Sequence, residues 1–158
     1  MRTNVEGAAQ TVETFAPLLS KAGNPRVIFM SSTLGSHTRV AELHIGKDWP
    51  AYSTTKAAVN MIMLWFANHY PGWKVNACCP GFRVRLSSYI LQFNEYADFG
   101  KATNLNNFAT AGTQSPIPGK LEDGAMNAVR LTLLGKDGET ATFTSRDDKT
   151  GEIRSLPW

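Results

Sequence analysis

Two short and almost entirely apolar runs constrain the fold of this chain most strongly. Residues 26–31 read Arg-Val-Ile-Phe-Met-Ser, and residues 74–79 read Lys-Val-Asn-Ala-Cys-Cys. Such runs are typical of strands buried on both faces of a parallel sheet. Segments with apolar residues at helical spacing lie at residues 3–21, 50–70 and 121–134, and a further short strand is expected at residues 140–144. The alternation predicts an α/β fold with a parallel sheet.

The composition narrows the class of protein. The 158 residues suit one domain, and 42% hydrophobic with 18% charged residues is typical of a folded globular protein. The net charge of +3 is spread along the chain, so we expect neither a nucleic-acid partner nor a membrane partner. No apolar stretch approaches the roughly 20 residues of a membrane span, and the first residues do not resemble a signal peptide.

The two cysteines, Cys78 and Cys79, are adjacent in one of the expected strands. Neighbouring side chains of a strand point to opposite faces, so we expect two free thiols. Free thiols favour a cytoplasmic location. The histidines have no metal-ligand spacing among themselves or with the cysteines, so no metal site is expected.

Four features occur in order along the chain, near the ends of the expected helices and strands. Asn4 lies on the first helix, Ser31 and Ser32 end the first strand, Tyr52 and Lys56 are one helical turn apart, and Pro80-Gly81 follows the second strand. A tyrosine phenol titrates near pH ~10, and an ammonium one turn away is expected to lower that pKa. Tyr52 can then exchange a proton with a carbonyl or alcohol oxygen.

Each feature also has a purely structural alternative. Tyr52 and Lys56 can be an ordinary side-chain pair on an amphipathic helix. Asn4 can cap the first helix, and the two serines can be turn residues at a strand end.

Taken in order, these residues resemble the short-chain dehydrogenase/reductase family, in its carbonyl reductase-like branch. The matching stretches are residues 4–7 (Asn-Val-Glu-Gly), 27–32 (Val-Ile-Phe-Met-Ser-Ser), 52–56 (Tyr-Ser-Thr-Thr-Lys) and 75–81 (Val-Asn-Ala-Cys-Cys-Pro-Gly). The resemblance implies the C-terminal half of a Rossmann-type, doubly wound sheet. It also implies an oxidoreductase that uses NADP(H), with NAD(H) as the alternative, on a small carbonyl or alcohol.

The resemblance also implies a role for each residue. Tyr52 is the acid–base group, Ser32 hydrogen-bonds the substrate oxygen, and Asn4 holds a water of the proton relay. Lys56 contacts the nicotinamide ribose beside Tyr52. The remaining cofactor-binding positions are Pro80, Gly81 and Thr103.

Two departures from the family pattern modify these expectations. No glycine-rich Gly-x-x-x-Gly-x-Gly or Gly-x-Gly-x-x-Gly motif occurs, so residues 1–158 are expected to form one partial catalytic domain with weak cofactor affinity. The strand at residues 26–31 would then have an open edge, for which we expect poor solubility, with the oligomeric state left open. The alternative function is an inactive truncated fragment or a non-enzymatic binding protein.

The second departure is the segment at residues 83–101, which follows Pro80-Gly81-Phe82. Joining Phe82 through one residue to Ala102-Thr103 restores the pattern of the family. The segment is therefore interpreted as an intron retained in the gene model or as a substrate loop. Its aromatic residues suit a pocket lining under the second interpretation; they are Tyr89, Phe93, Tyr96 and Phe99.

Overall fold

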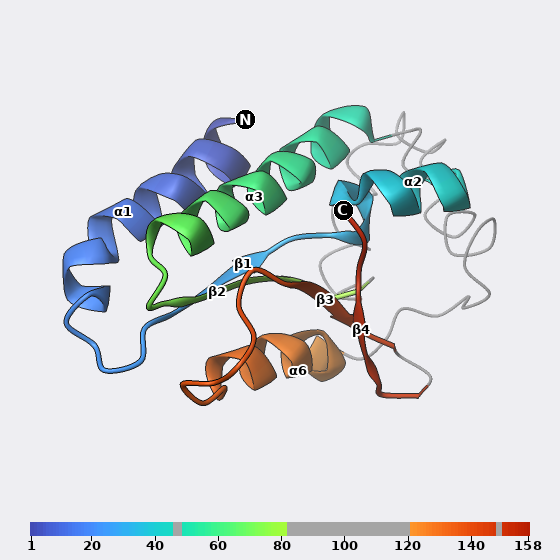
Figure 1. Cartoon of the computed structure of the whole chain (residues 1–158). Helices are drawn as coiled ribbons and strands as arrows, with labels where there is room; N and C mark the ends of the chain where they lie inside the picture. Colours follow the sequence, from blue (N-terminus) through green and yellow to red (C-terminus); the bar gives the residue numbers. More distant parts are fainter. Residues whose placement is uncertain (46–48, 82–120, 148–149) are drawn as a thin grey trace.

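A computed structural model describes residues 1–45, 49–81, 121–147 and 150–158 of the chain (Figure 1). In chain order its elements are η1 (Arg2–Glu6), α1 (Gly7–Leu19), β1 (Arg26–Met30), η2 (Thr33–Gly35), α2 (His37–Leu43), α3 (Pro50–His69), β2 (Lys74–Cys79), α6 (Leu121–Thr132), β3 (Phe143–Arg146) and β4 (Ile153–Ser155).

The four strands form one sheet in the order β1-β2-β3-β4. β1 pairs with β2, and β2 with β3, in parallel, whereas β4 runs antiparallel to β3. The register places Met30 of β1 opposite Cys78 of β2, so the two strands reach their carboxyl ends together. The α/β prediction with a parallel sheet is confirmed, and β4 is an element that the sequence patterns did not predict.

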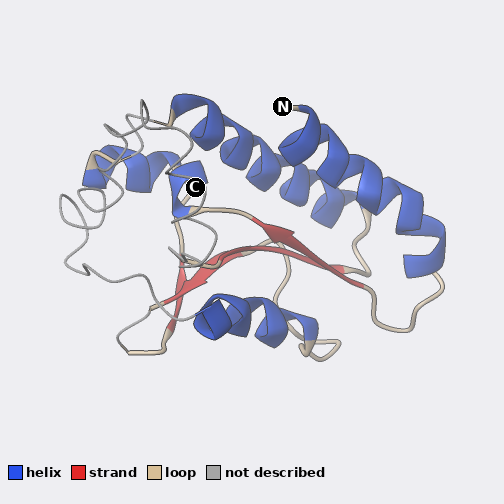
Figure 2. Cartoon of the chain, turned by 180° about the vertical axis from the view of Figure 1, so that it is seen from behind, coloured by secondary structure: helices blue, strands red, loops and turns tan. Residues whose placement is uncertain are grey.

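Helices cover both faces of the sheet. α1 and α3 lie side by side on one face, and α6 lies on the other (Figures 1 and 2). The core between the sheet and α3 is apolar and is centred on Met63 and Phe66 of α3, with Val75 and Ala77 of β2 below them. This helix therefore sits rigidly on the strands, which fixes the position of its first turn.

The limits of the elements follow local chemistry. α3 begins at Pro50, where the missing N–H of proline costs nothing because the first turn of a helix leaves it unpaired. The polar segment at residues 33–49, which lies between the predicted elements, contains η2 and α2, and Ser36 caps α2 by accepting from Arg39 N–H. The last parallel strand begins at Phe143 rather than at residue 140, because Ala141 has a positive φ of 57°.

β1 lies at an edge of this sheet. Met30 at its end is 45% exposed, and no described strand pairs with the outer side of β1. The open edge expected from the sequence is therefore present in the described part of the chain. Poor solubility stays a prediction, which sedimentation velocity over a range of protein concentrations tests.

The last residues of the chain fold back over the carboxyl end of the sheet (Figure 1). The Ser36 hydroxyl donates to the Pro157 carbonyl at 2.6 Å, and the Thr38 hydroxyl donates to the Trp158 carbonyl at 2.6 Å. The Trp158 ring stacks on Phe143 with ring centroids 5.8 Å apart. The last three residues therefore connect Ser36 and Thr38, which follow η2, to Phe143 of β3.

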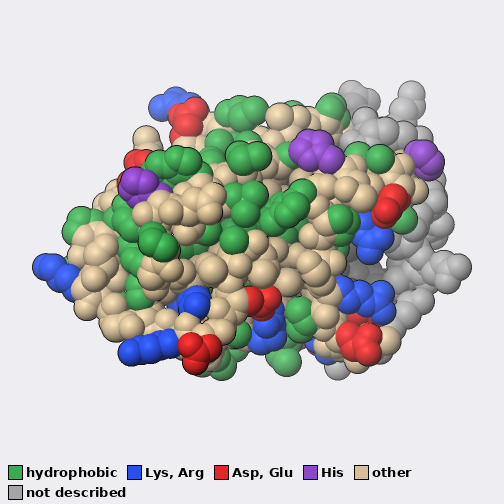
Figure 3. Space-filling model, in the orientation of Figure 1, with side chains coloured by type: hydrophobic (Ala, Val, Ile, Leu, Met, Phe, Trp, Pro, Cys, Tyr) green, Lys and Arg blue, Asp and Glu red, His purple; other side chains and the backbone are tan. Residues whose placement is uncertain are grey.

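Apolar side chains also reach the outer surface of α1 and α3. Figure 3 shows hydrophobic groups interspersed with polar ones on the face that these helices form. The large exposed members are Phe15 and Leu18 on α1 and Met61 and Trp65 on α3. None of the helices in the described ranges combines the length and apolar character needed to cross a membrane.

Candidate active site

The carboxyl ends of β1 and β2 bring two turns together. The Ser31 N–H donates to the Cys78 carbonyl at 2.8 Å, which extends the strand pairing into the first turn. Pro80-Gly81 follows directly after β2, and Gly81 has a φ of +74°, a backbone conformation that favours glycine. Ligands of open α/β sheets bind at the carboxyl ends of the strands, so these two turns border the expected ligand site.

The first turns of α3 lean over the same edge. The Lys56 Nζ lies 5.6 Å from the centroid of the Tyr52 ring. The same ammonium group donates a hydrogen bond of 2.8 Å to the Met30 carbonyl at the end of β1. Lys56 therefore connects the helix of Tyr52 to the strand that leads into Ser32.

The Tyr52 phenol lies beside Ser32 in the structure. Partial burial raises the pKa of Tyr52 above its usual value, a hydrogen bond from the Ser32 side chain lowers it, and the nearby Cys79 raises it again. The net direction is upward. The sequence-based expectation that Lys56 lowers this pKa is therefore wrong for the chain as described, because desolvation outweighs the favourable contacts and the ammonium group is directed to Met30.

Burial also acts on Lys56. It lowers the pKa of the ammonium group, since removing a charge from water favours the neutral form, and Cys79 acts in the opposite direction. A phenol with a raised pKa is protonated at neutral pH. Tyr52 is therefore a neutral phenol that holds its proton more tightly than a free tyrosine does.

Asn4 lies in η1, one turn of π-helix at the start of the first helical segment. Its amide Nδ2 donates to the Thr55 Oγ1 at 3.1 Å, and that hydroxyl donates to the Tyr52 carbonyl at 2.7 Å. No side-chain capping bond is present at the N-terminus of η1, so the capping alternative does not describe Asn4. Its contact is with α3, behind Tyr52.

Asn60, which the sequence patterns did not single out, and Cys79 hold the Ser31–Gly35 turn from its two sides. The Ser31 hydroxyl donates to the Asn60 Oδ1 at 2.6 Å, and the Asn60 Nδ2 donates to the Gly35 carbonyl at 3.2 Å. On the other side of the turn, Cys79 Sγ accepts from the N–H groups of Thr33 at 3.2 Å and Gly81 at 3.4 Å. An asparagine within the apolar stripe of α3 is the sequence signal that points to the first of these networks.

Other expectations have simple outcomes. Cys78 and Cys79 are both free and buried. Within the described ranges, no three metal-ligating side chains converge. Thr103 and the segment at residues 83–101 lie outside the described residues, so their predicted roles stay predictions.

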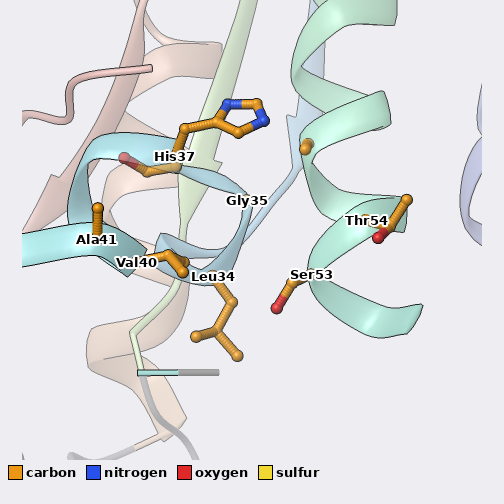
Figure 4. A pocket seen from close by; sticks show the side chains of 9 residues that line it. Leu34, Gly35, His37, Val40, Ala41, Ser53 and Thr54 are labelled. Atoms are coloured by element: carbon orange, nitrogen blue, oxygen red, sulfur yellow. The ribbon is translucent and has the colours of Figure 1, made fainter. Parts of the chain in front are cut away.

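A cavity of about 260 Å³ lies between η2–α2 and the start of α3 (Figure 4). Leu34, Val40 and Ala41 form one wall, and Ser53 and Thr54 contribute to the other. None of Ser32, Tyr52 and Lys56 lines this cavity. It lies next to the cluster of these three residues but is distinct from it.

The described part of the chain is thus a mostly parallel α/β sheet with a serine, a tyrosine and a lysine gathered at the carboxyl ends of β1 and β2, where open sheets of this class bind ligands. The sequence model of the short chain dehydrogenase family matches residues 1–85. The chain belongs to the short-chain dehydrogenase/reductase family.

Curated relatives agree with this assignment. The chain is 44% identical over 162 residues to the short-chain dehydrogenase/reductase ATR10 of Stachybotrys chlorohalonatus, covering 100% of this chain and 53% of that protein. It is 36% identical over 156 residues to tropE of Talaromyces stipitatus, covering 89% and 56%. The chain thus spans about half the length of the curated relatives it matches.

Solved structures show the same fold. NADPH-bound carbonyl reductase from chicken fatty liver superposes with a TM-score of 0.64 at 18% identity, over 99% of this chain and 54% of that one. Salutaridine reductase from Papaver somniferum gives 0.59 at 22% identity, over 89% and 51%. The described elements therefore correspond to about half of a complete family fold.

Proposed function

We propose that this chain carries the acid–base side of an NADP(H)-dependent oxidoreductase that reduces a carbonyl or oxidises an alcohol of a small molecule. The observation that carries the proposal is the meeting of Ser32, Tyr52 and Lys56 at the carboxyl ends of β1 and β2. Membership of a family of dehydrogenases and reductases supports the reaction class.

Tyr52 would donate its phenolic proton to the oxygen of a carbonyl substrate during reduction. The phenol is protonated at neutral pH, and its raised pKa makes it a weaker acid than a free tyrosine, so the transfer would follow the build-up of negative charge on the substrate oxygen. Ser32 would hydrogen-bond the same oxygen and orient it. Asn4, in its turn of π-helix behind Tyr52, is the proposed holder of a relay water, and π-helical turns are frequent at functional sites.

The residues on the nicotinamide side of the site fit the cofactor that the family implies. The Pro80-Gly81 turn and the Lys56 ammonium group lie at the edge where such a ring would bind, and Thr103 is the third proposed contact. A bound nicotinamide would supply or accept the hydride. The NADPH in the chicken carbonyl reductase supports NADP(H) over NAD(H) as the proposal.

A non-catalytic role is the second candidate, as an inactive fragment or a binding protein. The sequence of residues 1–158 holds no glycine-rich dinucleotide motif, which favours this candidate. Without that motif, little is left to bind the pyrophosphate, so we expect a cofactor affinity weaker than micromolar.

Titration of the purified chain with NADPH and with NADH separates the two candidates. The proposal expects weak binding with a preference for NADPH, and slow NADPH oxidation with small aldehydes or ketones at millimolar cofactor. Turnover that stays undetectable at saturating cofactor would favour the non-catalytic role. Micromolar affinity would overturn the expectation that the missing motif is essential.

Two further proposals concern the organisation and location of the protein. We propose that residues 83–101 are either a retained intron or a substrate loop, and that the protein is cytoplasmic, as free Cys78 and Cys79 favour. Sequencing of mature transcripts decides the first question, because the codons of an intron will be missing from most of them.

A further inference from the structure

We infer that Asn60 is a positioning residue that fixes the Ser32 turn against the helix of Tyr52 and Lys56. This inference rests on the proposed acid–base role of Tyr52. Asn60 touches neither Tyr52 nor Ser32 in the contacts described above; it acts through the residues at either end of the turn.

The contacts of Asn60 bracket Ser32. Its Oδ1 accepts from the Ser31 hydroxyl at 2.6 Å, immediately before Ser32, and its Nδ2 donates to the Gly35 carbonyl at 3.2 Å, three residues after it. Asn60 is 4% exposed and Ser31 is 3% exposed. One side chain therefore fixes the start and the end of the turn in a place without competing water.

The turn has almost no freedom to move along α3. A Cβ added to Gly35 would lie 2.7 Å from the Lys56 carbonyl carbon, so the backbones of η2 and α3 are in direct contact. Asn60 lies four residues after Lys56 and eight after Tyr52, on the same side of the helix. The helix thus presents Tyr52 to Ser32 and Asn60 to the ends of the turn that carries Ser32.

Packing alone gives no reason for an amide here. Asn60 is buried in the same helix as Val59 and Met63, where an apolar side chain would avoid the cost of burying polar atoms. The amide makes two hydrogen bonds, and both go to the turn of Ser32. Its placement is thus explained by the fixed geometry of that turn.

The test follows the ionisation of Tyr52 without cofactor or substrate. Phenolate absorbance is measured against pH for each protein and for its Tyr52→Phe counterpart, and the difference gives the Tyr52 titration. Far-UV circular dichroism at each pH limits the analysis to folded protein. Lys56 and Cys79, the charged or titratable groups identified beside Tyr52, are retained in every variant.

Asn60→Ala is expected to shift the Tyr52 titration to higher pH, in the direction of Ser32→Ala, because a loosened turn weakens the Ser32 hydrogen bond. In the double variant, the Asn60 change should add nothing to the shift of Ser32→Ala. Ser31→Ala removes one of the two bonds and should give a smaller shift. If Asn60→Ala does not fold, the Tyr52 titration of Ser31→Ala tests the inference in its place.

Asn127→Ala is the matched control. Asn127 is 1% exposed and also makes two side-chain hydrogen bonds, to Thr144 at 3.0 Å and from Arg130 at 3.0 Å, but on the α6 side of the sheet. It should lower the melting temperature and leave the Tyr52 titration in place.

The inference is overturned if Asn60→Ala and Ser31→Ala leave the Tyr52 titration unchanged, or if Asn60→Ala still shifts it when Ser32 is alanine. Absent turnover would count against the proposed function and leave this result intact.

Discussion

The two faces of the sheet differ in where they keep their buried polar groups. On the face covered by α1 and α3, Val75 and Ala77 meet an apolar core, and the polar network around Asn60 lies at the carboxyl end, beside Tyr52. On the α6 face, the buried polar residues lie on the strands and on the helix; they are Asn76 of β2, Thr144 of β3 and Asn127 of α6.

The partners of these groups explain the difference. The Asn76 amide donates to the Glu139 carbonyl at 3.0 Å and accepts from the Thr142 N–H at 3.1 Å, so it joins β2 to the segment before β3. Ion pairs lie at the rim of that face, such as Arg146 with Asp123 at 3.3 Å. The α6 face uses polar groups to connect elements, whereas the α3 face uses them to shape a site. The predictions below test this contrast.

The largest effect is expected for Tyr52→Phe. Loss of a general acid typically costs about 10²–10⁴-fold in rate, so any NADPH oxidation by the chain should fall by about that factor. Tyr52 is 38% exposed, and the melting temperature should change little. Steady-state kinetics at fixed, high NADPH measures the effect, and undiminished turnover would remove Tyr52 from the mechanism.

Gly35→Ala should destabilise the α3 side by about 1–3 kcal/mol, the usual cost of overpacking. The new methyl group would lie 2.7 Å from the Lys56 carbonyl carbon, 2.8 Å from its oxygen and 2.9 Å from the Lys56 Cβ, so the helix would have to shift. Gly23→Ala is the control, because its Cβ would meet no atom within 4 Å. Urea unfolding compares the two variants, and equal midpoints would contradict the close packing.

Cys78 gives the α6 face a pH dependence. Burial, with a smaller contribution from Cys79, raises the pKa of its thiol to about 11 from 9.0, and Arg130 opposes the shift. The stability from the raised pKa is present below pH 9 and is lost between pH 9 and 11. A shift of that size corresponds to at most about 2–3 kcal/mol. Unfolding of Cys78→Val across this window should show a shallower decline than the parent chain.

The smallest effect is expected for Arg154→Ala. The Arg154 guanidinium contacts Asp147 at 3.0 Å, but its side chain is 52% exposed. Exposed ion pairs contribute roughly 0–1 kcal/mol, so the urea midpoint should barely move. If Arg154→Ala lowered the urea midpoint as much as Gly35→Ala, the ion pair with Asp147 would be a substantial contributor to stability, contrary to this prediction.

The main elements and the central residues of the site could be predicted from the sequence. Apolar runs and Gly/Pro breaks gave β1, α3 and β2 almost to the residue, because burial and helix termination are local effects. The Tyr-x-x-x-Lys spacing singles out Tyr52 and Lys56, and the family resemblance adds Ser32; the structure brings the three together at one edge of the sheet, while their catalytic roles stay predictions.

What escaped prediction depends on contacts between distant segments. α2 is capped by Ser36, whose hydroxyl also bonds Pro157, and no local pattern connects those residues. The predicted direction of the Tyr52 pKa shift is wrong because the desolvation of the phenol depends on which groups the fold packs around the ring. Asn60 escaped notice because its two partners lie 29 and 25 residues away in sequence.

The tether between Ser36 and Pro157 has a consequence for the order of folding. The two residues are 121 positions apart in sequence. The ribosome must therefore synthesise most of the described chain before the segment after Ser32 can form this hydrogen bond. Long-range contacts of this kind form late, because loop closure costs entropy before the contact rewards it. On the ribosome, the apolar layer of α1, α3, β1 and β2 can assemble before residues 156–158 emerge, so the segment after Ser32 gains its contact with Pro157 only late in folding.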